Sequence, residues 1–407
     1  MNRKLSFIAL LFLLSTSLRA QEKLVFKGVM PIQAYAFIPM NQININRFSE
    51  LKEAGINLVI DNFPDIDAMK KGLDIAEKAG VKLLISCPEL KSQPEKTARL
   101  FMNHPAMGGY YIYDEPGIDL FPELSSWCKK IQTVDNKNLL YVNIWPNFAG
   151  RANLGTDSYK EYVQEYLKQL PVQVVSFDYY PVMKNRLSKT WYENLELISA
   201  ESKKAGLPFW AFALTSNYDE EHLNPQSLAA LRVQIYSNLA YGAQGICYYE
   251  YWDRTPASTT AVEDDRGGPI NAGGKRTVVF DRIKQMSAEI QALSPVFLGA
   301  KVVSVRHTGL GKIPEGTIRL TSLPKAIKVL DTNGAPALVS VLENGENSFL
   351  VVVNKDFLNS LNLTVYGDES VKKVLKDGSI VPASAYESSM ELDPGDAAIF
   401  MFPTEKK

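Results

Sequence analysis

Short apolar runs alternate with amphipathic stretches at a regular spacing from Lys27 to about residue 295. This alternation is typical of repeated βα units around a parallel sheet. We predict a strand at each of the eight apolar runs: 29–37, 57–60, 81–86, 109–113, 139–144, 172–177, 208–214 and 245–249. Eight such units predict a closed (β/α)8 barrel. A doubly wound sheet is the competing fold, but no glycine-rich phosphate turn follows the first strand.

The pattern changes after Pro295, where short alternating runs are separated by turns such as Asn333-Gly334 and Asp377-Gly378. Closely spaced strands without helices indicate an antiparallel β-sandwich. We therefore predict a barrel domain over residues 21–298 and a small all-β sandwich over residues 299–407. The second domain has no cluster of aromatic and acidic residues, so we expect it to support the barrel by packing; carbohydrate binding is the alternative role.

The first twenty residues have the composition of a secretory signal peptide. Arg3 and Lys4 precede an apolar run that is too short to span a bilayer comfortably, and a small residue follows at Ala20. We predict cleavage of residues 1–20 and export of the rest to the periplasm or the medium, without stable membrane insertion. The sequence does not determine the oligomeric state.

Composition argues against several classes of partner. The net charge is −1 and there is no polybasic block, so nucleic acid and anionic membranes are not expected partners. The three histidines are far apart and match no metal spacing, and we predict neither a metal nor a cofactor. The three cysteines lie in apolar stretches and are expected to be buried free thiols: Cys87, Cys128 and Cys247.

Three carboxylates stand at the ends of predicted strands. Glu115 follows an aromatic strand and precedes Pro116, which cannot extend a sheet, so it is expected at the C-terminal lip. Asp178 and Glu250 hold the equivalent positions after the sixth and eighth strands. In a (β/α)8 barrel this lip is the face that carries active sites.

Glycosidic cleavage uses two carboxyl groups, one to protonate the leaving oxygen and one to attack the anomeric carbon or activate water. We predict Glu115 as the acid, because desolvation and the adjacent Asp114 would raise its proton affinity. The alternative is that Asp114 and Glu115 only cap the following helix. For the second catalytic carboxylate we prefer Glu250 to Asp178 and leave both open. A separation of about 5 Å would suit retention, and about 6.5–9.5 Å inversion.

Other residues near the strand ends carry the amides, acids and rings that bind sugars. The predicted substrate-binding residues are Gln33, Tyr35, Asp61, Asn62, Tyr113, Asp114, Asn143, Trp145, Tyr179, Trp210, Tyr248 and Trp252.

Four stretches give the chain a recognisable resemblance: Tyr113-Asp114-Glu115-Pro116, Tyr141-Val142-Asn143-Ile144-Trp145-Pro146-Asn147, Phe177-Asp178-Tyr179-Tyr180-Pro181 and Ala240-Tyr241-Gly242-Ala243-Gln244-Gly245-Ile246. Over about residues 27–295 the chain resembles secreted bacterial glycoside hydrolases of the clan A barrel type, particularly family 42. The resemblance implies that Glu115 is the acid/base. Asp114 replaces the usual asparagine, and residues 209–215 lack the glutamate nucleophile that the clan carries after strand seven.

We therefore predict an exported glycoside hydrolase that cleaves a polysaccharide or oligosaccharide by carboxylate acid/base catalysis. The missing glutamate on strand seven motivates the alternative of a non-catalytic carbohydrate-binding protein on a degenerate glycosidase barrel. A lyase or a metal-dependent isomerase fits poorly, because the sequence has no histidine-rich constellation.

Overall fold

The structure is a computed structural model that describes residues 28–219, 221–222, 225–254, 266–383 and 389–405. The predicted signal peptide over residues 1–20 lies outside the described residues. Among the helices that are described, none is long and apolar enough to cross a membrane.

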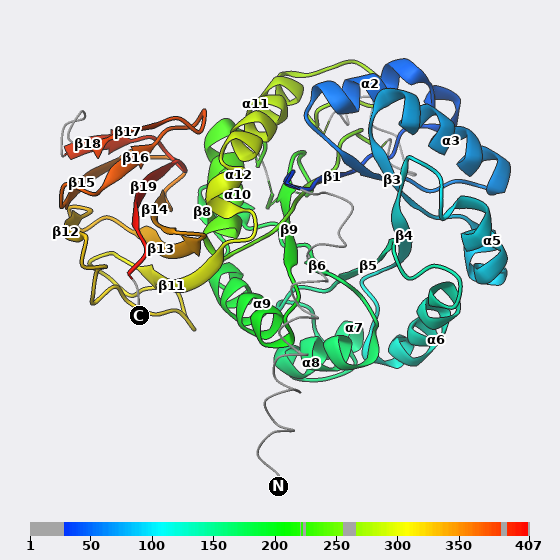
Figure 1. The fold of residues 1–407 in the computed structure, drawn as a ribbon, viewed down its shortest axis with the longest axis horizontal. Helices are drawn as coiled ribbons and strands as arrows, with labels where there is room; N and C mark the ends of the chain where they lie inside the picture. Colours follow the sequence, from blue (N-terminus) through cyan, green and yellow to red (C-terminus); the bar gives the residue numbers. More distant parts are fainter. Residues whose placement is uncertain (1–27, 220, 223–224, 255–265, 384–388, 406–407) are drawn as a thin grey trace, which may run out of the picture.

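Eight parallel strands close into a barrel in the order β1-β2-β3-β4-β5-β6-β9-β10, with β10 pairing back onto β1 (Figure 1). All eight predicted strands are present, which confirms the (β/α)8 barrel. Their bounds are β1 Ile32–Tyr35, β2 Leu58–Ile60, β3 Lys82–Ile85, β4 Met107–Asp114, β5 Leu139–Ile144, β6 Val175–Phe177, β9 Phe209–Leu214 and β10 Ile246–Tyr249.

Helices form a ring outside the strands (Figure 1). They are α2 Ile45–Glu53, α3 Ile66–Ala79, α4 Pro88–Ser92, α5 Pro94–Phe101, α6 Phe121–Gln132, α7 Arg151–Leu154, α8 Tyr159–Gln169, α9 Trp191–Ala205, α10 Leu228–Ala240, α11 Val278–Ala292 and α12 Ser294–Phe297, with short 3-10 turns η1 Met40–Gln42 and η2 Ile118–Leu120.

Helix α3 shows how the local sequence sets these elements. Its N-cap Asp65 accepts a hydrogen bond from the backbone N–H of Ala68, and the helix ends at Gly80, whose φ is 71°. Between the caps, apolar residues recur on one face, and Met69 and Leu73 are fully buried there. The sequence thus fixes both ends of the helix and the face that packs on the barrel.

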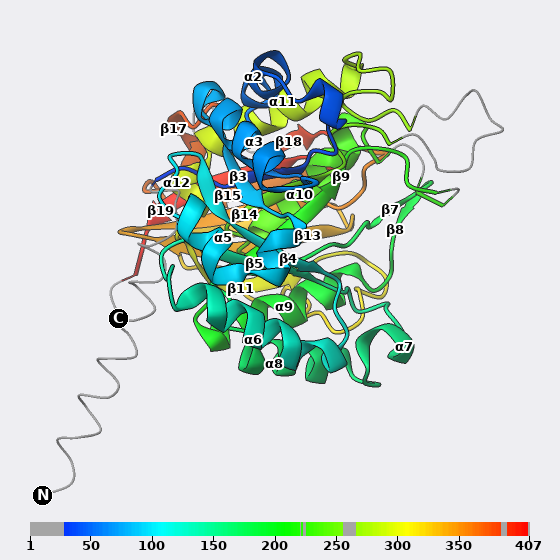
Figure 2. The ribbon, with the colours of Figure 1, turned by 90° about the vertical axis from the view of Figure 1, so that its right-hand side faces the viewer.

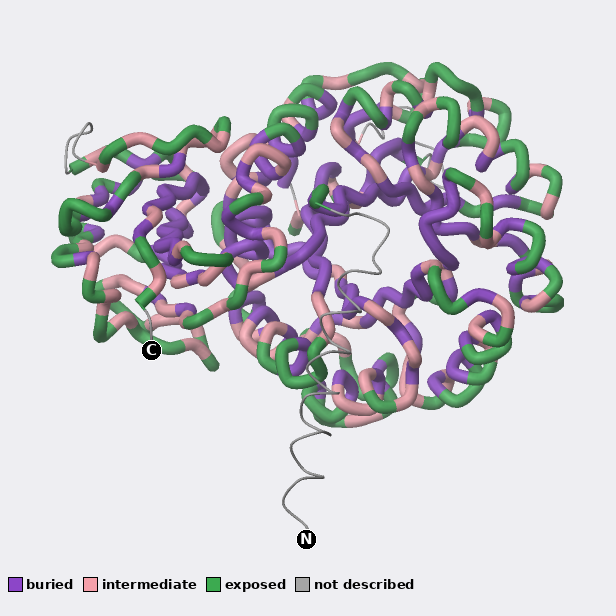
Figure 3. The backbone as a smooth tube through the Cα atoms, in the orientation of Figure 1, coloured by how far each residue is buried: buried purple, intermediate pink, exposed green. Residues whose placement is uncertain are grey.

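The barrel strands alternate between two cores. On β9, Trp210, Phe212 and Leu214 point into the barrel, whereas Ala211 and Ala213 pack with the surrounding helices. Figure 3 shows the resulting ring of buried strands. Since the interior is filled by side chains, a ligand can reach the barrel only at its ends.

The C-terminal region forms two antiparallel sheets, of orders β11-β13-β14-β19-β16-β17 and β12-β15-β18. Their facing sides share a core that includes Val339, Leu350 and Leu363, which confirms the predicted β-sandwich. The strands are β11 Lys301–His307, β12 Ile327–Asp331, β13 Ala337–Asn344, β14 Asn347–Asn354, β15 Leu361–Gly367, β16 Lys372–Val374, β17 Ile380–Pro382, β18 Ser389–Leu392 and β19 Ala397–Pro403.

The other face of the larger sheet packs on the barrel. Leu338 and Leu342 of β13 belong to the same core as the barrel helices, and the Ser340 hydroxyl donates to the Ala240 carbonyl at the end of α10 (2.7 Å). The sandwich is therefore continuous with the barrel core. The domain boundary at residues 298/299 stays a prediction; it falls between α12 and β11.

The three cysteines, Cys87, Cys128 and Cys247, are buried and unpaired with one another, as expected. Burial raises the pKa of each thiol, to about 11 for Cys87 and about 12 for Cys128, and further for Cys247. These thiols behave as small apolar core groups.

Candidate active site

A bulge in β4 places Asp114 at the mouth of the barrel. The pairing of β4 with β5 shifts register between Tyr111 and Tyr113, which brings Asp114 opposite Asn143. Without the bulge Tyr113 would hold that inward position; instead it is partly exposed at the rim. Because of the bulge, the Asp114 carboxylate and not the Tyr113 ring holds the inward position at the end of β4.

Glu115 leaves the strand in a left-handed backbone conformation, with φ of 52°. Its backbone N–H donates to the Asn143 carbonyl at 2.8 Å, which holds the turn in place. Few residues other than glycine adopt this conformation, and such outliers are concentrated at functional sites. The turn lets consecutive residues, Asp114 and Glu115, both contribute to the same cluster.

Asn143 joins the carboxylates of this cluster. Its side-chain amide donates to Asp178 Oδ1 at 2.8 Å and to Asp114 Oδ1 at 3.2 Å. The Glu115 and Asp178 carboxyl groups are themselves in hydrogen-bonding contact. Ends of β4, β5 and β6 thus converge on one carboxyl cluster, consisting of Asp114, Glu115 and Asp178.

The cluster retains a proton at neutral pH. Burial raises the pKa of Glu115 well above its usual range, and the charges of Asp178 and Asp114 raise it further. Burial, followed by the charge of Asp114, also raises the pKa of Asp178. Two carboxyls in contact cannot both ionise easily, so one proton is held between them.

Asp114 offers a direct test of this electrostatic coupling. Asp114→Asn removes a charge that raises the pKa of Glu115, so that pKa is expected to fall. If protonated Glu115 is the working acid, activity is present below its pKa and is lost as the pH rises through it. The alkaline limb of kcat/KM against pH should therefore move to lower pH in the variant, by up to about one unit. Glu123→Gln, on the surface of α6, is the control and should leave the alkaline limb where it is in the wild type. An alkaline limb that is also unchanged in Asp114→Asn would contradict the coupling.

Aromatic side chains surround the cluster. The Tyr35 hydroxyl donates to Asp114 Oδ1 at 3.3 Å, and its ring contacts those of Tyr111 and Tyr249. Tyr180 stacks on Tyr249 with ring centroids 5.4 Å apart, and Tyr218 packs against both. These rings provide the flat apolar faces and hydroxyls with which proteins hold sugars.

Glu250 has different surroundings. It is fully buried, and its carboxylate accepts hydrogen bonds from Arg254 Nε at 2.8 Å and Arg266 Nη1 at 3.5 Å. Arg254 also donates to the Tyr249 hydroxyl and lies over the Phe37 ring. Of the two candidates for the second carboxylate, the structure brings Asp178 into contact with Glu115 and surrounds Glu250 with arginines.

Apart from Tyr113 at the rim, the predicted binding residues divide into four groups. Tyr35, Asp114 and Asn143 belong to the cluster or touch it. Gln33 and Trp210 lie deeper, in the barrel interior, where Gln33 donates to the Tyr141 hydroxyl at 3.1 Å and Trp210 packs against the Tyr141 ring.

Residues at the ends of β2, β5 and β6 form the third group. Asp61 is buried, which raises its pKa to about 7, whereas the neighbouring Asn62 is exposed. Trp145 is half-buried. The Tyr179 hydroxyl bonds to Ser188 and Thr190, and its ring contacts that of the exposed Phe148. No contact of these residues with the carboxyl cluster is evident in the described part of the chain.

Tyr248 and Trp252 point away from the barrel mouth. Tyr248 faces the helices, where its hydroxyl bonds to that of Ser287 at 3.2 Å, because alternation along β10 directs Tyr249 inward instead. Trp252 packs in the same outer core, beneath the Arg47 guanidinium. Both contribute to packing in this structure.

Sequence reasoning did not single out Arg254, Tyr180 or Tyr218 as site residues. Tyr180 stands two residues after Asp178, and the period-two alternation of a strand could have placed it on the same side. Arg254 stands four residues after Glu250, and its opposite charge could have indicated an ion pair. Tyr218 lies in the loop after β9 and had no such signal. The pKa of its hydroxyl is raised by burial and then by the charges of Asp178 and Glu115, which places it beside the cluster.

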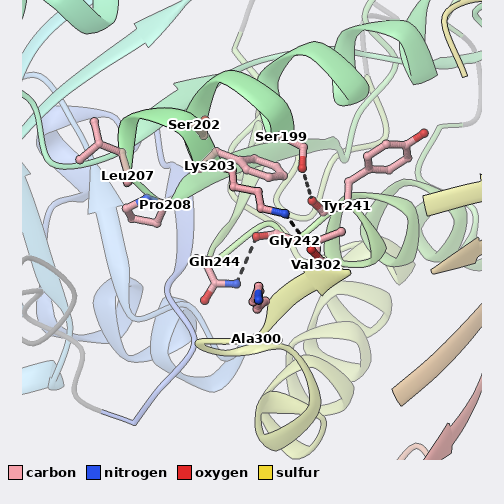
Figure 4. A pocket seen from close by; sticks show the side chains of 13 residues that line it. Ser199, Ser202, Lys203, Leu207, Pro208, Tyr241, Gly242, Gln244, Ala300 and Val302 are labelled. Atoms are coloured by element: carbon pink, nitrogen blue, oxygen red, sulfur yellow. Dashed lines mark hydrogen bonds between the residues drawn. The ribbon is translucent and has the colours of Figure 1, made fainter. Parts of the chain in front are cut away.

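The pocket in Figure 4 is lined by residues at the N-terminal ends of β9 and β10, and therefore lies at the end of the barrel opposite the carboxyl cluster. Its lining includes Pro208 and Gln244, which precede β9 and β10, and Val302 of β11. The Ser199 hydroxyl and the Lys203 ammonium donate to the carbonyls of Tyr241 and Val302, so these polar groups hold the chain together. This end of such barrels serves stability, so the pocket does not compete with the carboxyl cluster.

Among the described residues, no group of three or more histidine, cysteine, aspartate or glutamate side chains has the geometry of a metal site.

Comparison with known proteins supports the fold. The sequence matches no protein-family model, and no curated protein matches it significantly. A glycoside hydrolase family 5 protein from Bacteroides vulgatus has a similar structure, with a TM-score of 0.54 and 13% identity over 92% of this chain and 89% of that chain. A second structure, described as a glycoside hydrolase, gives a TM-score of 0.54 and 11% identity over 94% of this chain and 97% of that chain. At this identity the likeness concerns the fold, which includes both the barrel and the following sandwich.

Proposed function

We propose that this protein is a glycoside hydrolase. The observation that carries the proposal is the contact between the Glu115 and Asp178 carboxyls at the mouth of an aromatic-lined barrel. Two carboxyls that share one proton supply the acid and the base that glycosidic cleavage needs. The two solved structures compared above are described as glycoside hydrolases and share this fold, which agrees with the proposal.

Glu115 is the proton donor in this proposal. Its carboxyl has the most elevated proton affinity of the pair, through burial and two neighbouring negative charges. A carboxylic acid that stays protonated at neutral pH can protonate the glycosidic oxygen as the bond breaks. Hydrogen bonds hold the other two carboxyls of the cluster in position: the Asn143 amide donates to Asp178, and the Tyr35 hydroxyl donates to Asp114.

Asp178 is the ionised partner and the nucleophile. Its side-chain hydrogen bond with Glu115 favours the close pairing of retaining enzymes over the wider spacing that inversion requires. The reaction then passes through a glycosyl ester on Asp178, and Glu115 activates the water that cleaves it.

Glu250 is a positioning residue rather than the nucleophile in this proposal. Both oxygens of its carboxylate are engaged by arginines, and Arg254 extends from it to the Tyr249 hydroxyl at the mouth. Burial raises the pKa of Asp114, and the charge of Arg254, together with hydrogen bonds to the carboxylate, opposes this rise. Glu250 thereby holds the Arg254 guanidinium beside the carboxyl cluster.

Glu250→Gln separates these two roles. We expect a loss of about 1–3 kcal/mol in the free energy of unfolding, because one charge of a buried network is removed while both arginines retain access to water. The kcat should fall by less than about tenfold. Thermal denaturation and steady-state kinetics measure both. A loss above about 10³-fold with an unchanged melting temperature would return Glu250 to the catalytic pair.

The substrate class can be found by incubating the purified mature chain with aryl glycosides and with neutral and acidic oligosaccharides, and following the products by mass spectrometry. We expect release of sugar from at least one glycoside by the wild type and none by Glu115→Gln. Binding without product from any of the glycans would favour the carbohydrate-binding alternative.

Three finer points belong to the same proposal. The chain is exported to the periplasm or the medium after cleavage of residues 1–20. Its barrel belongs to clan A and is closest in motif to family 42, with Asp114 at the position of the family's asparagine. Its ligand is a carbohydrate, and it needs no metal or other cofactor.

A further inference from the structure

A second pocket, of about 750 Å³, lies between the barrel and the C-terminal sandwich. A hairpin of the barrel consists of β7 Val182–Met183 and β8 Arg186–Leu187, and the barrel lines the pocket with residues 185–190, from the turn of this hairpin onward, and with Tyr192. The sandwich contributes two loops, 312–315 and 355–359, and Pro336. The hairpin follows the C-terminal end of β6 and projects from the barrel on that side (Figure 2). The pocket therefore shares a face of the molecule with the carboxyl cluster.

One segment of chain links the two sites. Ser188 and Thr190 line the second pocket, and both bond to the hydroxyl of Tyr179, at 2.6 and 2.7 Å. Tyr179 directly follows Asp178 of the carboxyl cluster. Tyr179 thus connects the segment that lines the second pocket with the strand end that carries Asp178.

The lining of this pocket has an excess of positive charge. It includes two acidic residues, Glu315 and Asp356, and four cationic ones: Arg186, Lys189, Lys312 and Lys355. The Asp356 carboxylate is already engaged, because it accepts the backbone N–H groups of Leu358 and Asn359 in its own loop. The pocket as a whole attracts anions.

Lys355 is the most informative of these cations. Only 9% of the residue is exposed, and its ammonium bonds to His307 Nδ1 at 3.1 Å and lies over the Tyr192 ring. None of the ion pairs within the described ranges includes Lys355. The hydrogen-bond chain continues from His307 to Tyr241 and then to the Glu196 carboxylate, so two neutral groups separate the charges.

A buried ammonium without an adjacent carboxylate is costly. Burial, with the charge of Arg319 as a second cause, lowers the pKa of Lys355 to about 8. An anion bound in the pocket would supply the missing counter-charge. The apolar lining residues Leu187, Pro314 and Leu358 offer surface for the rings that carry such a group.

We infer that this pocket binds an acidic sugar unit, through a carboxylate or sulfate ester placed between Lys355 and the rim cations Arg186 and Lys312. The inference rests on the proposed function in taking the ligand to be a saccharide. It makes the substrate an acidic glycan whose chain spans the barrel mouth and the junction with the sandwich.

The test is isothermal titration calorimetry on the full mature chain carrying Glu115→Gln, which prevents turnover. The probes are a galacturonate hexasaccharide, a sulfated galactan hexasaccharide, the neutral galactan hexasaccharide and inorganic sulfate. At least one acidic hexasaccharide should bind about tenfold or more tightly than the neutral one, and less tightly as salt is raised. Adding Arg186→Glu and Lys312→Glu together should abolish that difference, whereas Lys137→Glu, an exposed residue before β5, should not.

Three results would overturn the inference. The first is equal affinity for the acidic and neutral hexasaccharides, and the second is an affinity for the acidic hexasaccharide that survives the double substitution. The third is inorganic sulfate binding as tightly as the sulfated hexasaccharide, which would make the pocket a site for free anions. If the wild type cleaves no glycoside and the charge-dependent binding persists, the proposed function fails while the acidic site stands. Because Arg186 and Lys312 are exposed, the double variant is expected to fold.

Discussion

Glu115→Gln should reduce kcat on substrates with poor leaving groups by about 10³-fold or more, because the amide cannot donate the proton that the leaving oxygen needs. Gln has nearly the shape of Glu, and the backbone turn at this position is held by the N–H bond to Asn143. The fold should therefore persist, with an unchanged circular dichroism spectrum. Steady-state kinetics on the substrate identified by the screen measure the loss.

The leaving group provides the internal control for this variant. A dinitrophenyl glycoside departs without protonation, so its bond cleavage should be much less affected than that of an alkyl glycoside or an oligosaccharide. Equal losses on both classes would mean that Glu115 does not act as the acid. Glu123→Gln, the same change on the exposed surface of α6, should leave both rates unchanged.

Asp178→Asn should lower kcat by a factor of about 10⁴ on all glycosides, because the amide neither attacks the anomeric carbon nor bears the negative charge that stabilises the transition state. Unlike the loss in Glu115→Gln, this one should not depend on the leaving group. Removal of the charge also lowers the pKa of Glu115, so any residual activity should decline at a lower pH. Steady-state kinetics across a series of aryl leaving groups distinguish the two variants.

Asp178→Asn should also identify the nucleophile by chemical rescue. Added azide can attack the anomeric centre in place of the missing carboxylate, and a nucleophile variant is expected to yield the glycosyl azide of opposite configuration. If Glu250→Gln gave this product and Asp178→Asn did not, Glu250 and not Asp178 would be the nucleophile.

The positions of Glu115 and Asp178 at the strand ends could be predicted because proline and a change of hydrophobic pattern mark where each strand stops. All eight barrel strands could be located for the same reason, with boundaries that differ by a few residues. The choice between Asp178 and Glu250 could not be made. It depends on two arginines, Arg254 and Arg266, which pair with Glu250 but lie outside the strands, so strand periodicity does not place them.

The sequence also could not show which aromatic rings point toward the barrel mouth. Tyr248 and Tyr249 are adjacent and chemically identical, and the register of β10 alone decides which one reaches the mouth. The bulge in β4 likewise changes which of Tyr113 and Asp114 faces inward. A one-residue shift is invisible in composition and motif, yet it determines which side chains make up the site.

The configuration of the first product tests the central claim most directly, because it depends on both the identity and the separation of the two carboxyls. Proton NMR of the wild-type reaction, recorded before the released sugar can mutarotate, reports that configuration. The contact between Glu115 and Asp178 predicts a product with the anomeric configuration of the substrate. A product of inverted configuration, formed by an enzyme that needs both residues, would contradict the account.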